Sequence, residues 1–320
     1  RAIFASAEDP EDLKREGETM TNPDFADTLE ALAREGEDLF YRGDIAATMV
    51  AFLQRHGAPF DATDFAEFFA KVEEPTRTDY RGYTVYKQGF GSQGPVLLQT
   101  LNILETFDLQ SMGHNSPDYL HTLIEAMKLA FADRAHWLGD PAFAKVPRGL
   151  VDKAYAKKQA ARIRMNRATS VKTHGTPPRS TDHLYGKHTT HFSCADGDGN
   201  WVSCTATVNT SFGSKVIIPG TGVILNNEMD DFSIQPGVPN AFGLIGAEAN
   251  AIAPGKRPLS SMSPSIVLRK GKPILAVGAA GGPTIITQTL LAIIHTIDFG
   301  LPVKEALSQP RFHHQDRKSV

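Results

Sequence analysis

The sequence predicts an α+β fold with a helix-rich first half and a strand-rich second half. Apolar residues recur at helical spacing before about residue 160. A polar stretch follows, and beyond it the apolar spacing changes to the two-residue period of strands separated by turns. Helices and strands segregated in this way are typical of packed α+β layers. The chain shows no internal repeat.

Two long helical patterns lie in the first half. A periodic run begins at the helix-start signal Asn22-Pro23-Asp24 and continues to a stop at Gly57. A second helix is expected from Asp118 to Trp137, where these apolar residues recur at helical spacing: Leu120, Ile124, Met127 and Phe131. We interpret both segments as scaffold, with their His and Met side chains serving in packing.

The second half begins with a linker and continues with two hairpins. Residues 165–187 are polar and contain Pro177 and Pro178, which predicts an exposed loop. Strands at 191–194 and 201–205 flank a Gly-Asp-Gly-Asn turn, and a second hairpin is expected over 266–277. An apolar helix is expected from about Thr284 to Phe299.

Composition and charge exclude several classes of protein. The 320 residues include 41% hydrophobic ones, enough for a large core, but no apolar run approaches the ~20 residues of a membrane span. A net charge of −3 argues against a nucleic-acid partner. Two cysteines exclude a disulfide framework, and we expect Cys194 and Cys204 to be small buried thiols. Because the chain starts at Arg1 without Met, and stops just after a motif-like stretch, we expect truncation at both ends.

The first stretch that could carry chemistry surrounds the first hairpin. In a strand, residues two apart share a face, so Thr205, Thr207 and Asn209 are expected to project together, with Thr189 beside them. If this polar row is buried, each hydroxyl needs a partner, which would indicate a site. On these residues alone, a solvated Thr-rich hairpin is the more ordinary interpretation.

The second stretch combines acids with hydroxyls. Asn226–Phe232 contains adjacent carboxylates that can hold an ammonium group, and Lys256–Pro264 contains paired hydroxyls that can hold a carboxylate. Together they suit an amino-acid head group, which carries both charges. Taken singly, each segment is more often a turn or a cap.

The third stretch is a glycine pair between a strand and a helix. Gly281 and Gly282 precede Pro283, which suits a first helical turn. Their N–H groups would lie at the positive end of the helix, as in an oxyanion hole. A purely structural turn is the alternative.

No metal site or cofactor motif is found in the sequence. Asp196-x-Asp198-x-Asn200 begins like a calcium loop, but Trp201 and Thr207 stand where Gly and Glu are needed. The histidine pairs lack metal-ligand spacing with any cysteine pair. We therefore expect neither a metal nor a cofactor.

Taken in order, these stretches resemble the γ-glutamyltransferases, the glutathione hydrolases. The resemblance extends over essentially the whole chain and is close from Thr189 onward. Five motifs carry it in register: Thr189–Ser193, Thr207–Asn209, Asn226–Phe232, Arg257–Pro264 and Gly281-Gly282.

The resemblance implies an N-terminal-nucleophile hydrolase with a four-layer αββα sandwich. The precursor would cleave itself between His188 and Thr189, leaving a large subunit (1–188) and a small subunit (189–320) as a heterodimer within one sandwich domain. Thr189 would be the nucleophile, with its own α-amine as base. The other implied site residues are Thr207 for orientation, Asn209, Glu228 and Asp231 for the substrate amine, Ser260 and Ser261 for its carboxylate, and Gly281 and Gly282 for the oxyanion.

The implied reaction is γ-glutamyl transfer from glutathione or a similar donor to water, an amino acid or a dipeptide. The implied location is periplasmic or secreted, because bacterial relatives are commonly exported. Three departures concern the substrate: the family's carboxylate-binding arginine belongs to an earlier segment, Phe242 in the expected lid replaces a common Tyr, and Gly91-Ser92-Gln93-Gly94 replaces Ser-Ser-Gly-Gly. The last departure favours acylase-like relatives, so a glutaryl-amide or β-lactam side-chain acylase is the alternative function.

Overall fold

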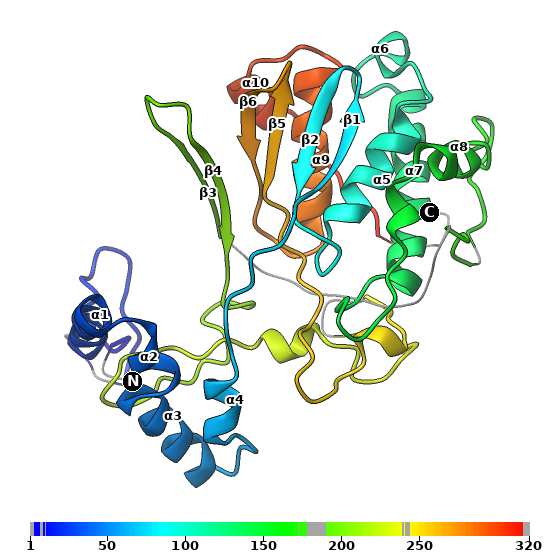
Figure 1. Cartoon of the computed structure of the whole chain (residues 1–320). Helices are drawn as coiled ribbons and strands as arrows, with labels where there is room; N and C mark the ends of the chain where they lie inside the picture. Colours follow the sequence, from blue (N-terminus) through cyan, green and yellow to red (C-terminus); the bar gives the residue numbers. More distant parts are fainter. Residues whose placement is uncertain are drawn as a thin grey trace. The chain divides into compact units, whose positions relative to one another are not determined.

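The computed structural model describes residues 3–6, 9, 11–171, 173–177, 190–238, 240 and 244–315. The chain divides into two compact units (Figure 1). The first unit consists of Arg1–Val72 with Phe212–Asn226, and the second of Glu73–Ser211 with Asn227–Val320. Helices and strands are both present, as the α+β prediction requires.

The first unit is helical. It contains α1 (Pro23–Glu35), α2 (Glu37–Tyr41), α3 (Asp44–Arg55) and α4 (Ala62–Ala66). The run predicted from Asn22 to Gly57 is therefore helical but divided in three. Gly36, at φ 81°, ends α1 and begins α2, and a side chain at Gly43 would collide with the backbone of Leu39.

The second unit is built on a four-stranded antiparallel sheet of order β1-β2-β5-β6. Its strands are β1 (Thr76–Tyr80), β2 (Tyr83–Lys87), β5 (Ser265–Arg269) and β6 (Lys272–Val277). A separate hairpin pairs β3 (Thr190–Ala195) with β4 (Trp201–Ala206). Both predicted hairpins are confirmed. The β1–β2 hairpin was not predicted, and it turns at Arg81 and Gly82, both with positive φ.

Helices of the second unit cover one face of this sheet (Figure 1). The helices predicted near 118–137 and 284–299 are confirmed as α7 and α9. The helical elements are α5 (Gly94–Leu104), α6 (Leu109–Met112), α7 (Pro117–Trp137), η1 (Arg148–Val151), α8 (Lys153–Ala160), η2 (Glu228–Asp231), η3 (Glu248–Asn250), α9 (Thr284–Ile297) and α10 (Val303–Ser308).

The main core lies between the sheet and α5, α7 and α9. Val85, Val267 and Leu275 are aligned across three strands and belong to one buried cluster with the helices. Ile266, Leu268 and Ile274 alternate with these core positions and are partly exposed, with 39% exposure at Ile274. The sheet therefore has one covered face and one apolar face that remains partly open.

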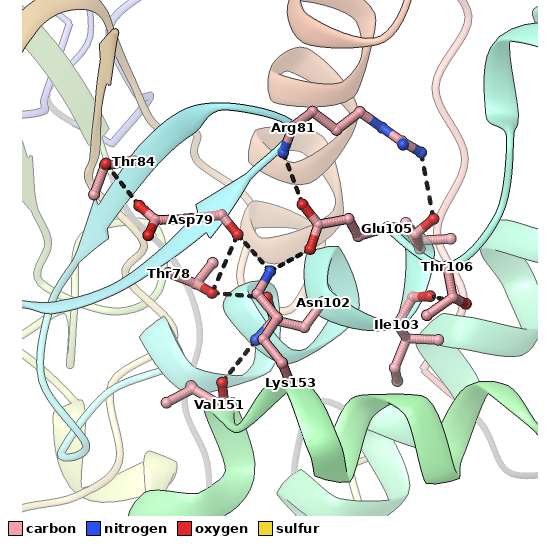
Figure 2. Close-up of polar contacts among 11 residues, drawn as sticks. Thr78, Asp79, Arg81, Thr84, Asn102, Ile103, Glu105, Thr106, Val151 and Lys153 are labelled. Carbon is pink, nitrogen blue, oxygen red and sulfur yellow. Dashed lines mark hydrogen bonds and ion pairs between the residues drawn. The ribbon is translucent and has the colours of Figure 1, made fainter. Parts of the chain in front are cut away.

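Polar contacts fasten the β1–β2 hairpin to the helices (Figure 2). Thr78 Oγ1 donates to Asn102 Oδ1 (2.7 Å), and Asn102 Nδ2 donates to Val151 O (2.7 Å). Glu105 accepts from the backbone N–H of Arg81 (2.8 Å) and from Lys153 Nζ (2.5 Å). These bonds fix β1 and the β1–β2 turn relative to α5.

A second polar network holds residue 175, near the end of the described first half. Asp133, on α7, accepts from Gly175 N (2.5 Å) and from three side chains, Gln99, Tyr155 and Gln159, at 2.5 to 2.7 Å. Trp137 Nε1 donates to Gly175 O (3.1 Å). A side chain at Gly175 would collide with Tyr155 and Gln159, so the network requires glycine.

Candidate active site

The hairpin β3–β4 brings the start of the second half to the sheet. Thr190 is the first residue of β3, whereas His188 and Thr189 lie outside the described residues. Ser203 on β4 accepts from Ser265 N (3.1 Å) and donates to Val277 O (3.4 Å), which attaches the hairpin to β5 and β6. Cys194 is exposed and Cys204 is half-buried, so the expectation of buried thiols is wrong, although both thiols are free.

His191 occupies the junction between the hairpin and β6. Its Nδ1 lies 2.8 Å from Thr205 Oγ1, and its ring packs so closely on Gly278 that any side chain there would collide with it. Burial, with a smaller contribution from the charge of Lys87, lowers the pKa of His191. The imidazole is therefore neutral near pH 7.

Thr207 and Asn209 do not continue the strand, so the predicted strand row of three polar residues is wrong. β4 ends at Ala206, and Asn209 has φ 75°, which turns the chain. In this turn Thr207 Oγ1 accepts from Asn209 N (2.8 Å). Asn209 is 1% exposed and its Nδ2 donates to Asn227 O (3.0 Å). The turn thus places Thr207 and Asn209 against the acidic segment.

The acidic segment forms the short helix η2. Glu228 and Asp231, both at least partly buried, share a side-chain hydrogen bond. Burial raises the pKa of Glu228 to about 7, and the bond to Asp231 opposes this shift only in part. Asp231 is 1% exposed. A cation bound beside Glu228 would favour its charged form and so offset the cost of burying the carboxylate.

Asn250 joins the acidic segment to the serine segment, and the sequence analysis missed it. Its Nδ2 donates to Asp231 O (2.6 Å), and its Oδ1 accepts from Leu259 N (3.0 Å). Leu259 directly precedes Ser260 and Ser261. Ser261 is 2% exposed, and its Oγ has no hydrogen-bond partner among the described residues. Asn250 therefore fixes the separation between the acid pair and the serine pair. No local sequence signal identifies it, because both of its partners are distant in the chain.

Gly281 and Gly282 lie directly before Pro283 and helix α9. Both have positive φ, 112° and 64°. The carbonyl of Gly281 accepts from Thr284 Oγ1 (2.7 Å), while neither glycine N–H donates a hydrogen bond to another described residue. Gly278, which precedes them in the same segment, packs against the ring of His191, so this segment contacts the β3–β4 hairpin. The glycine pair therefore lies directly before a helix, as expected, and its role as a pair of oxyanion donors stays a prediction.

Phe242 and the centre of the expected lid lie outside the described residues. Within the part of the chain that is described, no group of three or more His, Cys, Asp or Glu side chains could hold a metal ion. No helix in that part is long and apolar enough to cross a membrane.

Comparisons with known proteins identify the family of the chain. The Gamma-glutamyltranspeptidase family model matches residues 1–319. The chain is 44% identical to the glutathione hydrolase proenzyme of Escherichia coli strain K12, over 98% of this chain and 54% of that protein. It is 39% identical to the Acylase ACY 1 proenzyme of Pseudomonas sp. strain SE83, over 92% of this chain and 50% of that protein.

A solved structure is similar over a comparable range. The crystal structure of cephalosporin acylase from Bacillus halodurans superposes with a TM-score of 0.80 at 32% identity, covering 94% of this chain and 51% of that one. The chain spans about half the length of the curated relatives it matches. Since the family model and these relatives match nearly all of its residues, the chain belongs to the γ-glutamyltranspeptidase family.

Proposed function

We propose that the gene product carrying this chain transfers γ-glutamyl groups from glutathione or similar donors to water, an amino acid or a dipeptide. One observation carries the proposal beyond family membership: Asn250 holds a buried acid pair and a serine pair at a fixed separation. An amino-acid head group, with an ammonium and a carboxylate on one carbon, is complementary to such a pair of subsites.

The proposed chemistry starts with cleavage between His188 and Thr189. The freed α-amine, with an ordinary pKa of about 7.7 to 8.0, accepts the proton of the Thr189 hydroxyl as that oxygen attacks the γ-carbonyl. Thr207 orients the hydroxyl, and the N–H groups of Gly281 and Gly282 stabilise the oxyanion. Collapse of the tetrahedral intermediate expels the donor amine and leaves a γ-glutamyl ester, which water or an acceptor amine then cleaves.

We propose that the substrate is bound through both of its charged groups. Asn209, Glu228 and Asp231 take the α-ammonium, and Ser260 and Ser261 take the α-carboxylate. No cofactor takes part in these steps.

The proposed assembly is a heterodimer of residues 1–188 and 189–320 that together form one sandwich domain of four αββα layers. The open apolar face of the sheet, at Ile266, Leu268 and Ile274, supports this arrangement because a second sheet would bury it. We propose a periplasmic or secreted location on the strength of the family resemblance.

The second candidate is a glutaryl-amide or β-lactam side-chain acylase. The similarity to an acylase proenzyme and to a cephalosporin acylase supports it. A glutaryl group has a carboxylate but no α-amine, so it would leave Asp231 and Glu228 without a cation. The presence of both acids favours the γ-glutamyl donor.

Two measurements on the expressed gene product test the proposal. The smaller chain should begin Thr-Thr-His-Phe, and Thr189→Ala should remain a single chain because no hydroxyl is left for the acyl shift. A protein that stays one chain while it cleaves γ-glutamyl anilide would refute the cleavage step.

The second measurement separates the two donors. Asp231→Ala should cost about 3 kcal/mol in kcat/KM for a γ-glutamyl anilide, because the substrate ammonium loses its buried partner. The same variant should keep its activity on a glutaryl anilide. Asp230→Ala is the matched control, since Asp230 is an exposed acid in the same short helix. Equal loss on both donors would show that Asp231 is structural.

A further inference from the structure

The loop between β2 and α5 lies against the serine pair. Ser92 forms an isolated parallel β-bridge with Ser260, so Gln93 and Ser261 each directly follow a residue at which the two segments meet. Ser92 Oγ donates to Gly89 O (3.0 Å) and accepts from Gly94 N (3.3 Å). A side chain at Gly94 would collide with the backbone of Gln88. The backbone at Gln93 is therefore fixed on both sides.

The side chain of Gln93 is held in one orientation by Arg134 on α7. Arg134 Nε donates to Gln93 Oε1 (2.6 Å), and both residues are buried, at 1% and 0% exposure. Because a guanidinium can only donate, the amide oxygen must face it. The amide NH₂ group then points away from Arg134, and because the amide oxygen accepts from a positive guanidinium, the amide is polarised and its NH₂ group is a stronger donor.

Two buried donors, one on each of these two segments, are left without acceptors among the described residues. These are Nε2 of Gln93 and the hydroxyl of Ser261. A buried donor without an acceptor costs free energy, so such groups indicate a missing oxygen ligand. The low exposure of Gln93 does not argue against contact with a substrate. The proposed substrate-binding residues are equally buried, since Asn209, Asp231 and Ser261 are 1 to 2% exposed.

We propose that Gln93 is a further substrate-binding residue, which donates to the carboxylate of the γ-glutamyl or glutaryl donor beside Ser261. Arg134 is the positioning residue that orients the amide. This inference rests on the proposed function and adds a specificity determinant to the same site. It also gives a physical role to a residue at which this sequence departs from Ser-Ser-Gly-Gly.

The test compares three anilide donors in single-turnover assays of the processed enzyme. The γ-glutamyl donor has both charged groups, the glutaryl donor has only the carboxylate, and the 4-aminobutyryl donor has only the amine. Gln93→Leu removes the amide, and Gln93→Glu keeps the oxygen that Arg134 needs while it removes the NH₂ donor. Thr289→Val is the control, because it replaces another buried hydroxyl that has no partner among the described residues.

In both Gln93 variants the second-order rate constant of acylation by the γ-glutamyl and glutaryl donors should fall about 10- to 100-fold. This is the loss expected when a hydrogen bond to a charged group is removed. The 4-aminobutyryl donor should react as with the unchanged enzyme, and Thr289→Val should change none of the three. Equal loss on all three donors, or loss on none, would overturn the inference. An unchanged enzyme that acylates neither carboxylate donor would instead refute the proposed function.

Discussion

Replacing Glu228 by Gln tests whether a buried carboxyl pair stands in the site. Burial raises the pKa of Glu228 to about 7, from an ordinary value of 4.5. The folded chain therefore keeps this proton up to about pH 7, while the unfolded chain releases it near pH 4.5. Gln has nearly the shape of the protonated acid, but it does not ionise.

The sign of the effect follows from proton linkage. The stability that neutral Glu228 contributes is fully present below pH 4.5 and is lost as the pH rises through 7. At about 1.4 kcal/mol per pH unit, the shift in the pKa of Glu228 from 4.5 to about 7 corresponds to about 3 kcal/mol of unfolding free energy. This figure is an upper limit, because water screens a carboxyl that is only partly buried. Glu228→Gln should match the unchanged protein in acid and become more stable than it toward neutral pH.

The assay is urea unfolding of both proteins at several values between about pH 5 and pH 8. The difference in unfolding free energy should grow with pH and become constant above about pH 7. In parallel, the part of the rise in kcat/KM for the γ-glutamyl donor that comes from ionisation of Glu228 should be absent from the variant, whereas the rise from the proposed Thr189 α-amine should remain in both proteins. Stability curves that run parallel at all pH values would refute the buried, raised pKa.

Three further outcomes are expected. Gly282→Val should slow turnover about 100-fold or more while thermal melting stays cooperative, since a side chain would displace an oxyanion donor; rate and folding lost together would mean that the glycines serve only the turn. Asn250→Ala should cost about 1–3 kcal/mol for each of its two side-chain bonds and raise KM for the γ-glutamyl donor, and unchanged urea midpoint and KM would contradict its bridging role. Burial lowers the pKa of Lys87, which donates to Ser263 and Ser265, so the stability of Lys87→Met relative to the unchanged protein should fall as the pH rises toward the ordinary value of 10.5; a pH-independent difference would show that Lys87 titrates normally.

Local chemistry made part of the fold predictable. The β3–β4 turn was read from its glycines and acids, and in the structure Asp196 Oδ1 accepts from the backbone of Asp198 and Asn200. The same residues explain why the segment begins like a calcium loop: Asp196 accepts backbone hydrogen bonds within the turn. The β1–β2 turn escaped notice because its first central residue is Arg81, which is rare at positive φ.

The candidate site was predictable as a set of motifs but not as an arrangement. Motif order indicated the residue types, yet the bend at Asn209 broke the expected strand row. The bridge through Asn250 and the contact between Gln93 and Arg134 join segments far apart in the sequence. Such long-range hydrogen bonds leave no periodic or local trace in a sequence.

The anchoring of Gly175 by Asp133 has a consequence for the cleaved protein. Twelve residues lie between Gly175 and His188, so a carboxyl end formed at His188 by the proposed cleavage would lie no further than roughly 45 Å from the anchor. If the proposed cleavage occurs, we expect the new carboxyl end to stay in the neighbourhood of α7 and not to diffuse freely, because the Asp133 network would still hold Gly175 after the bond is broken.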